Sequence, residues 1–173
     1  PVGHFGVPFG PDRRRHYVAI AAGSGITPVL SVLSTALAVE PGSRGTLIYA
    51  NRSTAGVMFL DELADLKDRY TDWFALYHVL SREAQEVELL SGRLDGQRLD
   101  QVLDAFAPPD TVDEWFLCGP FGLVKTARAV LSRRGADPRR IHFELFHVED
   151  TAPPPRIAAD DGAARAASTV TVT

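Results

Sequence analysis

Residues 16–30 read HYVAIAAGSGITPVL, an apolar run that meets two glycines and passes into a helical pattern. The segment from His16 to Ala22 is short, apolar and bounded by glycine, which is typical of a buried strand. From Pro28 to Val39 apolar residues recur at helical spacing, until Pro41 and Gly42 stop the pattern. The sequence therefore predicts a strand, a glycine turn and a helix in direct succession.

The same alternation continues along the chain. Further strands are expected at Thr46–Ala50, Trp73–Leu80, Glu114–Cys118 and Ile141–Phe146, and further helices at Phe59–Tyr70, Leu94–Phe106 and Gly122–Arg134. Strands that alternate with helices form right-handed parallel crossovers, so helices cover both faces of the sheet. We therefore predict an α/β three-layer sandwich with a parallel sheet of roughly five strands and a ligand site at the carboxyl ends of its strands.

Composition limits the function classes. The chain has 173 residues and a formal net charge of -4, which suits one core domain and argues against nucleic acid or a membrane surface as the main partner. No apolar run approaches the roughly 20 residues of a membrane span. Cys118 is the single cysteine, which excludes an internal disulfide and favours the reducing cytoplasm.

The glycine turn carries the first chemical signal. Glycines between a strand and a helix let backbone N–H groups approach a pyrophosphate at the positive end of the helix. Thr27 suits the N-cap position and Pro28 the first helical position. A tight turn with a well-capped helix is the alternative interpretation. The candidate pyrophosphate site consists of Gly23, Ser24, Gly25, Ile26, Thr27 and Pro28.

Arginines follow the next two strands. The usual dinucleotide fingerprint has an acid after the second strand to hold a ribose 2′-hydroxyl, but here Asn51, Arg52 and Ser53 follow it. An arginine suits a 2′-phosphate, which favours NADP(H) over NAD(H). Arg82, just after the third strand, could join Arg52, and Arg93 is a weaker candidate. Solvated surface arginines are the alternative for all three.

Two further positions stand out near strand ends. Cys118, Gly119 and Pro120 place a small side chain before a forced turn, although a lone cysteine in a strand is often inert core filler. Glu144 interrupts the apolar closing strand, either with a functional role or as a solvated edge residue. The sequence suggests no Ser-His-Asp arrangement, and its histidines lack metal-ligand spacing.

The ordered motifs allow a family comparison. They are Gly23 to Pro28, Tyr49-Ala50-Asn51-Arg52, Ser81-Arg82-Glu83, Cys118-Gly119-Pro120 and His142-Phe143-Glu144-Leu145-Phe146. With these motifs, the stretch from about Pro1 to Glu149 resembles the ferredoxin–NADP reductase superfamily, and within it the reductase components of phenylacetyl-CoA epoxidase and related oxygenases.

The resemblance implies roles for individual residues. Gly23 to Pro28 would bind pyrophosphate and the nicotinamide ribose, with Thr27 and Cys118 beside the nicotinamide at the hydride-transfer position. Arg52 and Arg82 would read the 2′-phosphate, and Glu144 would position or relay a proton near a flavin. The remaining residues of the implied cofactor site are Asn51, Ser81, Gly119, Pro120, Phe121 and, near the flavin ring, Phe146.

The resemblance also implies a domain plan. Residues 1–12 would end a missing FAD-binding barrel, residues 13–149 would form the NAD(P)-binding domain, and residues 169–173 would start a missing ferredoxin-like 2Fe–2S domain. Composition predicts a flexible linker at residues 150–168, which are rich in alanine, proline and aspartate and lack apolar periodicity. The flavin motif and the cluster cysteines of the family are absent, so FAD and 2Fe–2S are expected only in the full-length protein. That protein would pass electrons from NADPH to an oxygenase component.

Other function classes stay open. One is an NADH-using reductase of another aromatic-ring oxygenase, and another is a non-catalytic nucleotide-binding or docking module, since fold does not fix function. A short-chain alcohol dehydrogenase would need a Tyr-x-x-x-Lys pair, and none of the four tyrosines has such a partner.

Overall fold

The fold is built on one parallel sheet. The computed structural model describes residues 5–145. Its five strands follow the order β3-β2-β1-β4-β5, and every neighbouring pair is parallel, as the alternation of elements predicts. The chain moves outward from β1 to β3 and then returns to the other side of β1, so the order reverses between β1 and β4. The strands are β1 (His16–Ala22), β2 (Arg44–Asn51), β3 (Phe74–Leu80), β4 (Glu114–Gly119) and β5 (Ile141–Leu145).

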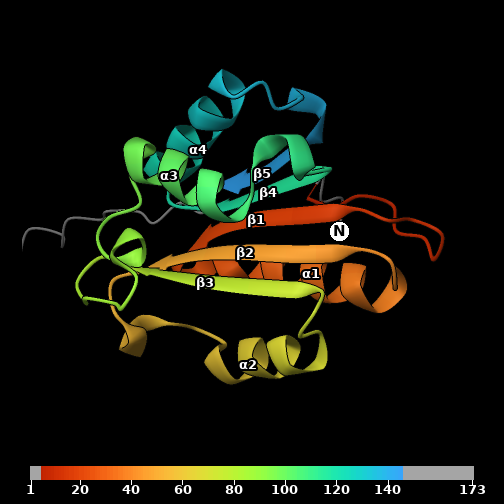
Figure 1. Ribbon diagram of the computed structural model, residues 1–173, viewed down its shortest axis with the longest axis horizontal. Helices are drawn as coiled ribbons and strands as arrows, with labels where there is room; N and C mark the ends of the chain where they lie inside the picture. The colour runs from red at the N-terminus through yellow and green to blue at the C-terminus, as the bar shows by residue number, and fades with distance from the viewer. Residues whose placement is uncertain (1–4, 146–173) are drawn as a thin grey trace, which may run out of the picture.

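Helices cover both faces of the sheet, as Figure 1 shows, which confirms the three-layer sandwich. Residues of β1 alternate between the faces: Tyr17 and Ala19 pack with α1 and α2, whereas Val18 and Ile20 pack with α3 and α4. None of the helices in residues 5–145 is both long and apolar enough to cross a membrane. The α-helices of the described residues are α1 (Ile26–Val39), α2 (Leu60–Arg69), α3 (Gly96–Phe106) and α4 (Phe121–Arg133).

The start of α1 differs from the prediction. The glycine turn forms a 3-10 helix, η1 (Gly23–Gly25), which runs directly into α1 at Ile26. The N-cap is Gly25, which has no side-chain cap bond, so the expected N-cap role of Thr27 is wrong. Thr27 and Pro28 are the second and third helical residues. Proline is tolerated there because the first N–H groups of a helix have no intrahelical partner.

The start of α3 also differs, because an apolar residue outside the helix extends the helical pattern. Leu94 is 7% exposed and belongs to the core, yet it precedes the helix. Asp95 is the N-cap, and its carboxylate accepts a hydrogen bond from the backbone N–H of Arg98 at 2.9 Å. A capping aspartate of this kind satisfies one of the free N–H groups of the first turn.

A close backbone contact joins η1 to β4. A Cβ atom built on Gly25 would lie 2.3 Å from the carbonyl oxygen of Cys118 and 2.8 Å from the amide nitrogen of Gly119. Both atoms belong to backbone, which cannot move aside as a flexible side chain can. Only glycine therefore lets the first turn of α1 approach the end of β4 at the point where the strand order reverses.

The segment before β1 is fastened to the domain through Glu40, the C-cap residue of α1. The Glu40 side chain is fully buried and accepts hydrogen bonds from the Tyr17 hydroxyl at 2.8 Å, the Ser43 hydroxyl at 2.7 Å and the backbone N–H of Gly10 at 3.1 Å. These three donors compensate the cost of burying a carboxylate. The ring of Phe5 packs against Phe116, 5.4 Å between centroids. Phe5 and Gly10 lie in the stretch that was expected to end another domain, and both contact this domain.

Gly25→Ala is expected to lower the free energy of unfolding by about 1–3 kcal/mol, because the added methyl group overpacks against fixed backbone. Urea unfolding followed by circular dichroism measures this change. Gly122→Ala is the matched control, since a Cβ there meets nothing within 4 Å. We expect the control to be neutral or more stable by up to about 1 kcal/mol. Equal effects of the two substitutions would contradict the steric explanation.

Candidate functional site

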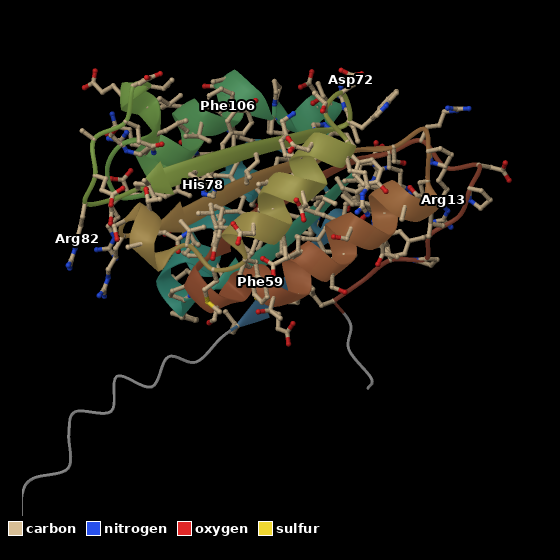
Figure 2. All side chains as sticks on the ribbon, turned by 90° about the horizontal axis from the view of Figure 1, so that it is seen from below. Arg13, Phe59, Asp72, His78, Arg82 and Phe106 are labelled. Atoms are coloured by element: carbon tan, nitrogen blue, oxygen red, sulfur yellow. The ribbon has the colours of Figure 1, made fainter. Side chains whose placement is uncertain are left out.

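A cavity of about 790 Å³ opens where the strands end. Its walls come from the carboxyl ends of β1, β2 and β3, from the segment before α3 and from the first turns of α4. In a doubly wound sheet, this edge near the reversal of strand order is where ligands bind. Figure 2 shows Arg82 projecting at one end of the molecule, while Arg13 and Asp72 lie at the opposite end.

The glycine turn supplies the β1 side of the cavity. Gly23 lines it with a backbone φ of +53°, a left-handed conformation that favours glycine, and a Cβ at this position would meet no atom within 4 Å. The space beside the turn is therefore open to a ligand. Of the predicted pyrophosphate residues, Gly23 lies in the wall, whereas Ser24 and Thr27 are exposed outside it and Pro28 is half-buried. Gly25 and Ile26 are buried.

A tyrosine on β2 fixes this turn. The Tyr49 side chain is fully buried, and its hydroxyl donates to the carbonyl oxygen of Gly23 at 2.9 Å and accepts from the backbone N–H of Met58 at 3.3 Å. Burial raises the pKa of Tyr49, so the hydroxyl keeps its proton. Tyr49 thereby connects the glycine turn with the segment after β2. The sequence motif contains this residue, but sequence reasoning does not give it a site role.

The segments after β2 and β3 run side by side. Backbone bonds join them, from Ser81 N–H to the Asn51 carbonyl at 3.0 Å and from Arg82 N–H to the Arg52 carbonyl at 2.8 Å. Asn51, Arg52 and Ser81 line the cavity, while Arg82 stands beside it. The Asn51 Nδ2 atom is buried and has no hydrogen-bond partner among residues 5–145, so it is a donor that a ligand could use. The structure thus brings both predicted arginine loops together.

The segment before α3 forms the opposite wall, which sequence reasoning undervalues. Gly92, Arg93, Leu94 and Asp95 line the cavity. Gly92 has a backbone φ of +103°, and its N–H donates to the Leu80 carbonyl at 2.8 Å, which holds the segment against the end of β3. The Gly92-Arg93 pair is the available sequence signal, since a glycine in a turn before an arginine suits an anion site.

The start of α4 completes the cavity. Pro120 is the N-cap of α4, and Pro120, Gly122, Leu123 and Thr126 lie in the wall. The N-terminus of a helix carries a partial positive charge and free N–H groups, both of which favour an anion. Phe121 is 63% exposed and lies outside the cavity wall, although it was predicted to bind the cofactor. Together with Arg52 and Arg93, this wall can bind phosphate groups.

Cys118 and Glu144 are register partners on neighbouring strands. The thiol of Cys118 is fully buried against α1, and Glu144 is exposed at the end of β5. Burial, helped by the Glu144 charge, raises the pKa of the Cys118 thiol to about 12. The cysteine is therefore a neutral thiol at physiological pH and no nucleophile. Neither residue lines the cavity, Gly119 is buried and does not line it either, and Phe146 lies outside the described residues. Their predicted roles stay predictions.

Comparisons with known proteins agree with this geometry. The family model described as oxidoreductase NAD-binding domain matches residues 19–129. One component of the 1,2-phenylacetyl-CoA epoxidase of Escherichia coli is 41% identical over 151 residues, 87% of this chain and 42% of that protein. The ferredoxin reductase component of 3-ketosteroid-9-alpha-monooxygenase from Mycobacterium tuberculosis is 33% identical over 156 residues, 90% of this chain and 40% of that protein.

A solved structure gives the same picture. The cytochrome P450 reductase GcoB of Amycolatopsis superimposes with a TM-score of 0.70 at 29% identity, covering 84% of this chain and 42% of that one. The chain thus spans about two fifths of the length of these two curated relatives, 42% and 40%.

The buried cysteine gives a chemical prediction. Because Cys118 is fully buried and its pKa is raised to about 12, the folded chain is expected to react with a thiol reagent such as DTNB at pH 8 far more slowly than the unfolded chain. In guanidinium chloride one thiol per chain should react at once, since Cys118 is the single cysteine. Equal rates in the two states would contradict the burial. The absorbance of the released thiolate measures both reactions.

Proposed function

The chain belongs to the family of oxidoreductase NAD-binding domains, and we propose on this basis that its strand-end cavity binds NADP(H). The observation that carries the proposal is one continuous cavity of about 790 Å³ that joins the glycine turn at Gly23 to the arginine loop at Arg52. A dinucleotide needs such a site, because its pyrophosphate and its adenosine ribose must be held at the same time.

The cavity walls divide the dinucleotide between them. Gly23 and the N-terminus of α4 face the pyrophosphate. The open space beside Gly23 gives it room, and the free N–H groups at the start of α4 donate hydrogen bonds to its oxygens. Arg52 and Ser81, with Arg82 beside them, hold the 2′-phosphate, for which a guanidinium fork is well suited. Arg93, in the opposite wall, adds a second cation to the same cavity.

The nicotinamide end lies toward β4 and β5 in this proposal. Thr27 is exposed in the first turn of α1, and the neutral thiol of Cys118, buried against α1, would support the packing at this end rather than act as a reactive thiolate. Glu144 is exposed near the end of β5, where it would position or relay a proton near the flavin. Pro120 and Phe121 would limit access of water to that end.

We further propose that the whole protein is an NAD(P)H-dependent reductase that serves an oxygenase. The named relatives are a component of an epoxidase and a reductase component of a monooxygenase, which supports the proposal. FAD would supply the hydride acceptor and a 2Fe–2S centre the single-electron carrier, both held by other domains of the longer protein. This chain contributes binding and orientation of the nicotinamide nucleotide. A cytoplasmic location follows from the single cysteine as a prediction.

Nucleotide titration tests the proposed function. The chain of 173 residues should bind NADPH more tightly than NADH and should show no reductase turnover without an added flavoprotein partner. Isothermal titration calorimetry measures both affinities, and the loss of NADPH absorbance measures turnover. A docking module would bind neither nucleotide, and a preference for NADH would assign the cavity to NAD(H) instead.

Arg52→Ala is expected to weaken NADPH binding by about 1.5–3 kcal/mol, the value of a hydrogen bond to a charged group, and to leave NADH binding nearly unchanged. Arg69→Ala is the matched control, because Arg69 is exposed in the last turn of α2 and does not line the cavity. The two dissociation constants of each variant are compared with those of the wild type. An equal loss for both nucleotides would remove Arg52 from the 2′-phosphate site.

A further inference from the structure

A side-chain contact bridges the two arginine loops. One carboxylate oxygen of Glu83, just after β3, accepts two hydrogen bonds from Thr54, one from the Thr54 hydroxyl at 2.7 Å and one from its backbone N–H at 3.0 Å. Thr54 begins the 3-10 helix η2 (Thr54–Gly56), whose N-cap Ser53 makes no side-chain cap bond. Glu83 therefore caps η2 from the neighbouring loop, and Gly56 at the end of η2 lines the cavity.

Glu83 brings a negative charge among cations. It directly follows Arg82, and the backbone bond from Arg82 to Arg52 places the two arginine backbones side by side. The hydrogen bonds from Thr54 lower the pKa of Glu83, so the carboxylate is ionised at neutral pH. Within residues 5–145 neither arginine forms an ion pair with a carboxylate. The charge of Glu83 is satisfied by Thr54 instead.

The direction of this carboxylate matters for cofactor choice. A carboxylate at the end of these strands can accept a hydrogen bond from the 2′-hydroxyl of NAD(H). It can also pair with an arginine and cancel the positive charge that a 2′-phosphate needs. Either use would favour NAD(H) over NADP(H). While Thr54 donates two hydrogen bonds to Glu83, both guanidinium groups stay available to a phosphate.

We propose that the Thr54–Glu83 pair is a specificity determinant that favours NADP(H), because it keeps the Glu83 carboxylate away from Arg52 and Arg82. Glu83 and Thr54 act through the arginines and are positioning residues. The inference rests on the proposed NADP(H) site and deepens it, since it explains how an acidic residue is tolerated beside a 2′-phosphate.

Two substitutions separate this role from a structural one, because they should move the cofactor preference in opposite directions. Thr54→Val removes the 2.7 Å hydrogen bond and leaves the carboxylate held only by the backbone N–H, so the ratio of NADP⁺ to NAD⁺ affinity should fall by about three- to five-fold. Glu83→Gln keeps an acceptor for Thr54 but removes the charge, so the ratio should rise. Thr54→Ser keeps the hydroxyl and should retain the wild-type ratio.

Calorimetric titration of the 173-residue chain and its three variants with NADP⁺ and NAD⁺ gives the ratios. A purely structural contact would make Thr54→Val and Glu83→Gln weaken both nucleotides in parallel, and that result would overturn the inference, as would an unchanged ratio in Thr54→Val. A wild-type chain that binds neither nucleotide is a different outcome, because it overturns the proposed function itself and the inference with it.

Discussion

The contact between Gly25 and the end of β4 is the constraint on which the site depends. A Cβ added at Gly25 would lie only 2.3 Å from the Cys118 carbonyl oxygen. The first turn of α1 can therefore reach β4 only because Gly25 has no side chain. This approach fixes the glycine turn beside the position where the strand order reverses. Gly23 and the start of α4 then line the same cavity. The missing side chain at Gly25 thus determines where the cavity wall at Gly23 lies.

Hydrogen bonds between the loops at the strand ends fix the shape of this edge of the sheet. Tyr49 joins the glycine turn to the segment after β2, and Glu83 joins that segment to the one after β3. Gly92 is held to the end of β3 in turn. Each loop is therefore positioned by its neighbour rather than by its own sequence. Such loops lose less freedom when a ligand binds, which favours affinity.

The sequence predicts the fold well because its signals are local. The strand from His16 to Ala22 has the same bounds in the structure. A short apolar run that ends at glycine is typical of a buried strand, so the sequence marks both ends. The helix start at Thr27 was wrong because a 3-10 turn continues into α1 without a cap. The expected loops at Arg52 and Ser81 do line one cavity.

What the sequence could not predict depends on contacts between distant residues. The wall at Arg93 follows from how the segment before α3 folds back on β3, and no periodic pattern marks it. The contact between Thr54 and Glu83 joins residues 29 positions apart through the pairing of β2 with β3. The exposed Phe121 shows the converse case, because a motif can include a residue whose side chain lies outside the cavity wall.

Glu40 gives α1 a mechanical role. The helix has 14 residues, a stiff rod of about 21 Å at 1.5 Å per residue. One end carries the glycine turn, and at the other end Glu40 binds the backbone of Gly10 in the segment that enters the domain. Because a helix of this length bends little, the segment at Gly10 and the glycine turn at Gly23 are held at opposite ends of one rigid element. The length of α1 therefore sets the spacing between the segment that leads into β1 and the glycine turn.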